Sequence, residues 1–383
     1  MSIKNTRREW LKSAALLAAG LSTANFTLSN PTKTPVYNPY TGEWMLNLPD
    51  QGLRARLNYN ENPYGPSEKA LQALRDALGE SSRYAFSMAD QFKEMIAEKE
   101  GVSADHIFLS AGSLEFLALT ALAHGLEGGN IISAYPTFQS LMDTAAAFDC
   151  EWKRIPVDSN YKHDLGRMEE AVNSNTKLMY ICNPNNPTGT FLDTAELAEF
   201  CKRVSNRVTV FVDEAYTEFH PDPESITVKH LVKEGHNVII AKTFSKIHGF
   251  AGLRVGYAIA QPAKIRKIEA YRLQMTTMTG PSIAAAMASY QDQEFMNFCR
   301  KKNTMAREQT YTILKDQGYE YVPSHTSFMI FRINTEPKSF LKGMRDQGVG
   351  VRSWTFHNKD WCRVSMGTVE EMEIFGNALK MIS

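Results

Sequence analysis

The sequence has no excess of either charge and no long apolar run. Its 383 residues contain 42 Lys and Arg against 42 Asp and Glu, so the formal net charge is zero. Proteins that bind nucleic acids normally carry a basic excess, so we expect no nucleic-acid partner. No apolar run reaches the roughly 18–20 residues that a membrane-spanning helix needs, which argues against stable insertion into a membrane. Repeats and low-complexity tracts are also missing, which leaves a globular chain large enough for two domains.

Cysteine is scarce, and its spacing fits neither a disulfide framework nor a zinc site. The chain has five cysteines, an odd number, and no two of them form a C-x-x-C pair. Paired spacings of that kind would be needed for either structure. We therefore expect buried thiols and no metal site.

The first residues have the pattern of an export signal. Arg7 and Arg8 are followed by Trp10 and Leu11, then by a short apolar stretch over residues 14–21 and by small residues up to Ala24. A basic start, a short apolar segment and small residues are typical of such signals. The adjacent arginines resemble the twin-arginine class. We predict a signal peptide over residues 1–24 that directs the folded, cofactor-loaded protein through the twin-arginine export machinery to a periplasmic or secreted location; a frayed terminal helix is the alternative.

The rest of the chain is typical of an α/β protein. Residues 31–66 are rich in Pro, Asn, Gly and Tyr, and we predict an extended N-terminal arm over residues 25–66. Ser67 is a good N-cap for a helix that Gly79 would end. Beyond it, helical stretches separate short apolar runs at residues 107–109, 131–132, 178–181, 208–212, 238–241 and 255–259. Such runs predict strands buried on both faces, hence a mostly parallel sheet between two helical layers.

The pattern changes after about residue 262. A long helical region to about residue 316 is followed by predicted strands at 320–322 and 328–333, and then by a helix, two strands and a helix. We therefore predict a large domain over residues 67–270 and a smaller C-terminal α/β domain over residues 271–383.

Polar clusters follow five of the predicted strands directly. They begin at Ser110, Tyr135, Asn183, Asp213 and Thr243. Ligands of open parallel sheets bind beyond the carboxyl ends of the strands, so these clusters are expected to meet in one crevice.

The residue types in these clusters suit one cofactor. A lysine with a lowered pKa, here Lys246, can form a Schiff base, and Asp213 could hold a protonated ring nitrogen. The small residues before the helix that starts near Ser113 would leave backbone N–H groups free for a phosphate, and Arg254 adds a cation. Lysine, aspartate, an anion-binding helix start and arginine are together what pyridoxal phosphate requires.

The chain resembles the class I/II aminotransferases of fold type I, most closely their histidinol-phosphate aminotransferase-like branch. The resemblance is carried by residues 57–64, 185–189, 213–216, 243–254 and 363–368, which follow one another in the family's order. It implies a pyridoxal-phosphate-dependent aminotransferase with a three-layer α/β/α large domain. The amino group would move between an amino acid, or an amine like histidinol phosphate, and a 2-oxo acid.

The resemblance also implies roles for single residues. Lys246 would form the Schiff base and later move the proton, and Asp213 would pair with the pyridine nitrogen. Asn186 and Tyr216 would bind the phenolic oxygen, and Phe138 would stack on the ring. The phosphate would be held by Gly112, Ser113, Ser245 and Arg254.

The resemblance further implies a homodimer and a set of substrate contacts. Tyr84 matches a tyrosine that reaches the cofactor phosphate of the neighbouring subunit. Arg363 matches the arginine that binds a substrate carboxylate, and Arg352 matches one that helps to hold the substrate phosphate in histidinol-phosphate enzymes. Tyr64, with His248, His325 and Trp354, is a candidate for lining the pocket.

Other reactions remain open at this point. An exported racemase or epimerase, or a decarboxylase or other lyase of the same fold, would share the lysine, the aspartate and the phosphate site. A non-catalytic protein that binds pyridoxal phosphate is a further alternative, although Lys246, Asp213 and Arg363 are all present.

Overall fold

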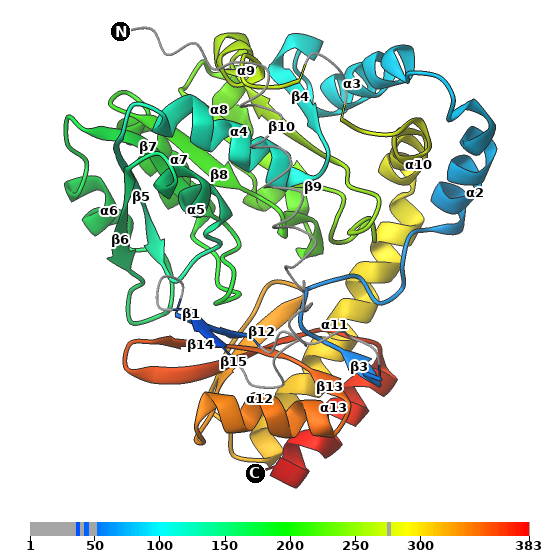
Figure 1. The fold of residues 1–383 in the computed structure, drawn as a ribbon, viewed down its shortest axis with the longest axis vertical. Coiled ribbons are helices and arrows are strands. Elements are labelled where there is room, and N and C mark those ends of the chain that lie inside the picture. The colour runs from blue at the N-terminus through cyan, green and yellow to red at the C-terminus, as the bar shows by residue number, and fades with distance from the viewer. Residues whose placement is uncertain (1–35, 39–41, 46–51, 274–276, 383) are drawn as a thin grey trace, which may run out of the picture.

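The computed structural model describes residues 36–38, 42–45, 52–273 and 277–382. The predicted signal peptide at residues 1–24 lies outside the described residues. Two sheets lie one beyond the other, and the long helix α11 (Gln293–Asp316) runs from the part with the larger sheet into the part with the smaller one (Figure 1). The predicted domain boundary near residue 270 remains a prediction.

The larger sheet has seven strands in the order β4-β10-β9-β8-β7-β5-β6. Only β10 is antiparallel to its neighbours, so the sheet is mostly parallel, as predicted. The strands are β4 (Ile107–Ser110), β5 (Gly129–Tyr135), β6 (Cys150–Pro156), β7 (Thr176–Cys182), β8 (Thr209–Asp213), β9 (Val238–Thr243) and β10 (Gly256–Ala260).

Both faces of this sheet are covered, as the continuous apolar runs predicted. Along β7, Leu178 and Tyr180 pack into one core cluster, whereas Met179 and Ile181 pack into the other. The first cluster is closed by α4 (Ser113–Gly125), α5 (Ser140–Ala146) and α9 (Pro262–Glu269). The second is closed by α3 (Phe86–Glu100), α6 (Leu165–Glu170), α7 (Thr194–Val204), α8 (His230–Lys233) and α10 (Gly280–Gln291). The result is a three-layer α/β/α arrangement.

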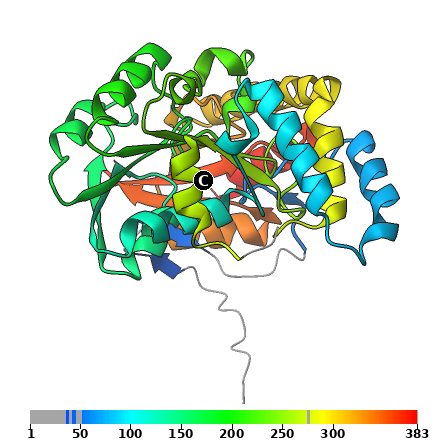
Figure 2. The ribbon, with the colours of Figure 1, turned by 90° about the horizontal axis from the view of Figure 1, so that it is seen from above.

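The predicted first helix is present as α2 (Glu68–Ala77), and the Ser67 side chain accepts a hydrogen bond from the Ala70 amide at its start. The α-helix ends at Ala77, before Gly79, and a 3-10 turn follows over Leu78–Glu80, so Gly79 is not the helix end that was predicted. Figure 2 shows α2 and α3 gathered beside α10 at one side of the molecule, where they contact it. The region predicted as one helical stretch to residue 316 is divided into α9, α10 and α11.

The smaller sheet is antiparallel, in the order β1-β2-β14-β15-β12-β11. Its strands are β1 (Val36–Asn38), β2 (Glu43–Met45), β11 (Tyr321–Val322), β12 (Phe328–Arg332), β14 (Arg352–Phe356) and β15 (Lys359–Ser365), and α12 (Pro337–Asp346) and α13 (Val369–Ile382) pack with it. A short parallel pair joins β3 (Ala55–Arg56) to β13 (Val349–Gly350). Three short segments of the predicted arm therefore form strands in sheets with the C-terminal part of the chain.

The five cysteines are buried and unpaired, which confirms the prediction. Within the described ranges, no group of His, Cys, Asp and Glu has an arrangement that could hold a metal ion. Across the same ranges, every helix is too short or too polar to cross a membrane.

Candidate active site

A cavity of about 370 Å³ lies at the carboxyl ends of the parallel strands. Its walls come from both sheets, since residues after β4, β5, β7, β8 and β9 face Arg352 of β14 and Arg363 of β15. The cavity collects most of the predicted site residues: Ser113, Phe138, Asn186, Asp213, Tyr216, Ser245, Lys246, Arg254, Arg352 and Arg363.

Lys246 follows the end of β9 and lies in this cavity. Its amine donates to the backbone oxygens of Tyr59 and Asn60, each at 3.2 Å. Burial, with the nearby positive charge of Arg363 as the second cause, lowers the pKa of Lys246 from 10.5 to about 8. About a tenth of the amine is therefore unprotonated at pH 7, far more than for a lysine with an ordinary pKa, and the unprotonated amine is the nucleophile.

Asp213 is the last residue of β8 and is deeply buried. Burial raises the pKa of its carboxyl group to about 6, although the Tyr180 hydroxyl and the Ala215 amide donate to it at 2.9 and 3.1 Å. A buried carboxylate held by neutral donors gains stability when a cationic group binds beside it.

Two polar chains connect the cavity walls. The Asn60 amide donates to the Tyr216 hydroxyl at 3.1 Å, and Asn60 is itself fixed to Ser365 through its backbone amide and its side-chain oxygen. The second chain starts at Asn186, whose side-chain oxygen accepts from Arg363 Nη1 at 2.7 Å. Each chain joins a residue beside the larger sheet to β15 of the smaller sheet, so both sheets shape the site.

The start of α4 forms a cradle that suits an anion. Gly112 precedes the helix with a φ of 73°, and among the described residues no side chain caps the helix's first amides. A Cβ atom at Gly112 would meet the guanidinium of Arg254, which donates to Ser245 Oγ at 3.1 Å. Free helix amides, a cation and a hydroxyl are thereby held together at one point, which is the donor set that binds phosphate.

Arg352 and Arg363 face each other across β14 and β15 as direct cross-strand partners. Arg363 is almost completely buried, and burial lowers its pKa to about 10. Arg352 forms an ion pair with the buried Glu43 of β2.

Several predicted residues lie elsewhere. Tyr84 is 74% exposed and packs against Phe86, with ring centroids 5.5 Å apart. Tyr64 lines a small separate cavity that shares Glu61 with the main one. His248 is buried, and its Nδ1 is hydrogen-bonded to Ser289. Trp354 lies behind the cavity wall, with its ring 4.9 Å from the Arg363 guanidinium carbon.

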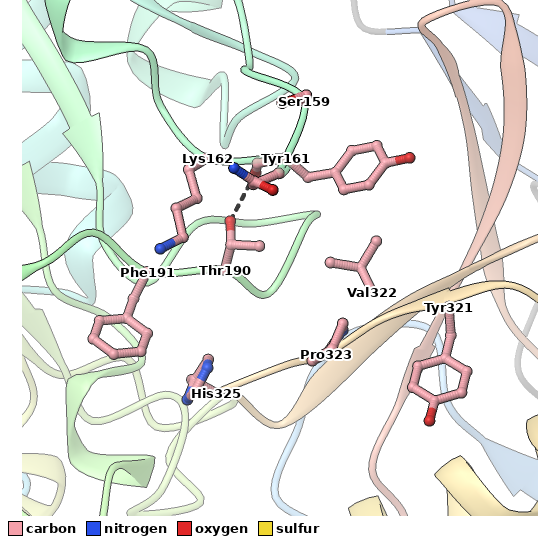
Figure 3. Close-up of a pocket in the computed structure, with 10 residues that line it drawn as sticks. Ser159, Tyr161, Lys162, Thr190, Phe191, Tyr321, Val322, Pro323 and His325 are labelled. Atoms are coloured by element: carbon pink, nitrogen blue, oxygen red, sulfur yellow. Dashed lines mark hydrogen bonds between the residues drawn. The ribbon is translucent and has the colours of Figure 1, made fainter.

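His325 lines a second cavity, of about 340 Å³, between the segment around Lys162 and strand β11 at the edge of the smaller sheet (Figure 3). Its ring packs edge-on against Phe191, with centroids 4.4 Å apart. His325 is therefore not among the residues that line the cavity around Lys246.

Three residues that contribute to the site were not assigned a role from the sequence. Tyr180 lies within a strand of the apolar core, where a buried hydroxyl needs a partner, so its presence in an apolar run was a usable signal. Asn60 lies in a segment that carried the family resemblance. Glu43 lies in the arm, far from every motif, and nothing local in the sequence indicates its role.

These residues fit pyridoxal phosphate. The buried Asp213 suits a protonated ring nitrogen, the α4 cradle suits a phosphate, and Lys246 has the lowered pKa that a Schiff-base lysine needs. The cavity would hold the cofactor between these groups.

Comparison with known proteins agrees with this assignment. Residues 55–379 match the family model described as aminotransferase class I and II. A histidinol-phosphate aminotransferase of Brevibacillus brevis is 34% identical over 328 residues, which are 85% of this chain and 90% of the relative.

Solved structures show the same fold. A candidate histidinol-phosphate aminotransferase of Erwinia carotovora atroseptica superposes with a TM-score of 0.81 at 31% identity, over 85% of this chain and 95% of the other. The histidinol-phosphate aminotransferase of Sinorhizobium meliloti, solved with pyridoxal-5'-phosphate, gives a TM-score of 0.79 at 24% identity, over 94% and 98% of the two chains. The chain therefore belongs to the class I and II aminotransferases, a family of enzymes that depend on pyridoxal phosphate.

Proposed function

We propose that this aminotransferase moves the amino group of an α-amino acid to a 2-oxo acid, with Lys246 as its catalytic residue. The observation that carries the proposal is the convergence of Lys246, Asp213 and Arg363 in one cavity. When bound, pyridoxal phosphate supplies an aldehyde that accepts the amino group and a ring that withdraws electrons from the substrate's Cα.

The protein's own residues would hold the cofactor and move the proton. Lys246 would join the cofactor covalently and, once displaced by the donor, its amine would take the Cα proton and return it to the cofactor side. Asp213 would keep the ring nitrogen protonated. Tyr216 and Asn186 would bind the ring's oxygen, Phe138 would cover the ring, and Ser113, Ser245 and Arg254, with the backbone at Gly112, would hold the phosphate.

Arg363 supports a substrate with a carboxylate. Its Nη1 and Nη2 atoms donate to Asn186 and to the Asn58 backbone oxygen at 2.7 and 2.6 Å, whereas its buried Nε atom has no hydrogen-bond partner in the described part of the chain. Both of these acceptors are neutral. A buried guanidinium gains most from a carboxylate, which it can bind through two parallel hydrogen bonds. The α-carboxylate of the amino acid or the 2-oxo acid is the group we assign to it.

A phosphorylated amine is the second candidate donor. The Brevibacillus brevis relative is named for histidinol phosphate, and Arg352 lines the cavity beside Arg363.

We also propose that the enzyme works as a homodimer, with Tyr84 of one subunit reaching the cofactor phosphate of the other. The exposure of the Tyr84 and Phe86 rings supports this, because large apolar side chains exposed next to each other often mark an interface.

We propose, on the pattern of residues 1–24, that the folded enzyme is exported by the twin-arginine route. Replacement of Arg7 and Arg8 by lysine should leave the enzyme in the cytoplasm, as measured by fractionation. Unchanged export would overturn this assignment.

The amino transfer itself is tested with ¹⁵N-labelled α-amino acids and an unlabelled 2-oxo acid. Mass spectrometry should find the label in the amino acid formed from the oxo acid. Release of carbon dioxide, or a donor that loses its chirality but keeps its label, would instead favour a decarboxylase or a racemase.

A further inference from the structure

We infer that Glu43 is a specificity-determining residue: by pairing with Arg352, it makes the site select α-amino acids with uncharged side chains over donors that carry a phosphate or a second carboxylate. This inference rests on the proposed function, since it names the substrate class of the same cavity. Glu43 acts through Arg352 and is not one of the residues that line the cavity.

Two arginines of like charge lie side by side in the cavity wall. Arg352 and Arg363 are directly opposite in the β14–β15 ladder, and both line the cavity. Like charges at such positions repel, so the pair is costly unless an anion lies close by. A phosphate or a second carboxylate on the substrate could be that anion. In this chain, the carboxylate of Glu43 already provides it.

The register of β2 places Glu43 at this position. Glu43 is opposite Trp354 in β14, which puts it on the same face as Arg352, two residues before Trp354 in that strand. The Gly42 carbonyl accepts from the Thr355 amide at 2.6 Å, and Trp44 Nε1 donates to Thr355 Oγ1 at 3.3 Å. Gly42 itself has a φ of 66°, and a Cβ atom there would meet the Tyr135 hydroxyl, so the close approach of the arm depends on glycine.

Burial makes the ion pair difficult to exchange. Glu43 is only 6% exposed, and burial raises the pKa of its carboxyl group in spite of the nearby Arg352 and Arg363. An incoming phosphate that took over Arg352 would leave this carboxylate buried without its partner and would also lie close to it. Glu43 is the buried member of this pair, and removing the partner of a buried charge is strongly unfavourable, so an anionic distal group is selected against.

The remaining surroundings of Arg352 suit a neutral side chain. Its guanidinium carbon lies 5.8 Å from the centre of the Tyr59 ring and 5.6 Å from that of Trp354. The cavity wall also includes Leu114 and Phe138. An amino acid with its carboxylate on Arg363 would place an uncharged side chain among these groups, and no further anion site is required.

The first test uses the wild-type holoenzyme and two pairs of donors. Serine is compared with O-phosphoserine, and phenylalanine with aspartate, by the rate at which each changes the absorbance of the bound cofactor. We expect the donor with the uncharged side chain to react at least 10-fold faster than its partner at equal concentration. A faster reaction of the phosphorylated or dicarboxylic member would overturn the inference. If no compound in a wide amino-donor panel reacts, it is the proposed function that fails.

The second test measures binding without turnover. Inorganic phosphate is titrated calorimetrically into the holoenzyme, into Glu43→Gln and into the double variant Glu43→Gln/Arg352→Gln. We expect at least 10-fold tighter binding in Glu43→Gln and loss of that gain in the double variant. Glu320→Gln, which removes a carboxylate paired with Arg332 and Lys359 near the far edge of the same sheet, is the matched control and should bind phosphate as the wild type does.

A third measurement compares the reaction rates of the phosphorylated and the neutral donor in Glu43→Gln and in the wild type. Loss of the Glu43 carboxylate should shift the ratio of the rate with O-phosphoserine to the rate with serine by at least 10-fold towards O-phosphoserine. Equal ratios in both proteins would contradict the inference, because a merely structural role of Glu43 would slow both donors alike. If Glu43→Gln does not fold, the wild-type donor pairs still decide.

Discussion

At the scale of the residue, the chemistry of the site depends on two side chains whose pKa values differ from their values in water. Burial lowers the pKa of Lys246 to about 8 and raises that of Asp213 to about 6. Both shifts have the same origin, since burial disfavours the charged form of each group. The lysine is thereby made nucleophilic, and the aspartate is prepared for a cationic partner.

The first prediction concerns the pH dependence of cofactor capture. Only the unprotonated amine of Lys246 can attack the aldehyde, so the rate at which the cofactor-free enzyme captures pyridoxal phosphate should rise about tenfold per pH unit and level off above about pH 8. Stopped-flow absorbance measures this rate. A rate that still rises at pH 10 would mean an ordinary lysine pKa. In Arg363→Gln the midpoint of this rate–pH profile should move to higher pH, because the variant removes a positive charge that lowers the pKa of Lys246.

The second prediction concerns Tyr180. Its hydroxyl donates to Asp213 at 2.9 Å and helps to keep that carboxyl group ionised. Tyr180→Phe should weaken cofactor binding by about 10- to 100-fold, in line with roughly 1.5–3 kcal/mol for a hydrogen bond to a charged group, as measured by fluorescence titration. Tyr257→Phe is the matched control, since it removes a buried hydroxyl that donates to Glu100 outside the cavity. Equal losses in both variants would assign the effect to stability alone.

At the scale of the element, the start of α4 is the part of the fold that receives the phosphate. Gly112→Ala would bring a methyl group against Arg254 at a position with φ of 73°. We expect cofactor affinity to fall by about 10- to 100-fold, because a displaced arginine no longer faces the free amides of the helix. Gly79→Ala should leave the affinity unchanged, since a Cβ atom there has no neighbour within 4 Å. Affinity that is equal in Gly112→Ala and the wild type would exclude this phosphate site.

The strands of the larger sheet and the residues at their ends could be predicted from the sequence. Continuous apolar runs such as residues 178–181 are specific for strands buried on both faces, and parallel strands bring the residues after them to one edge. The edge strand β6 was missed because its residues are only partly buried and do not form an apolar run. The break before α10 was missed although the sequence marks it, since Thr279 caps that helix and Pro281 stands in its first turn.

Contacts between distant segments could not be predicted in this way. Glu43 and Arg352 are about 300 residues apart, and β2 has only three residues, so no local pattern indicates their pairing. The same holds for Asn60, whose role depends on Ser365 of β15. Such contacts are set by which distant strands and loops become neighbours in the folded chain.

At the scale of the whole molecule, the proposed dimer predicts that each active site needs residues from both subunits. If Tyr84 acts across the interface, Lys246→Ala and Tyr84→Ala chains should each be nearly inactive as pure dimers. Their mixed dimer would combine one intact Lys246 with the partner's intact Tyr84 and should recover about half of the wild-type activity per dimer. Activity assays after mixing, unfolding and refolding would measure this. No recovery in a proven mixed dimer would place Tyr84 outside the neighbouring site.

The most direct measurement of the central claim is a single half-reaction. Holoenzyme is mixed with one amino donor in the absence of any 2-oxo acid, and the cofactor absorbance and the oxo acid formed are followed together. We predict one equivalent of 2-oxo acid per active site and a complete change of the cofactor spectrum, both abolished in Lys246→Ala. Exchange of the Cα hydrogen with solvent and loss of chirality, without any oxo acid, would contradict transamination at this site.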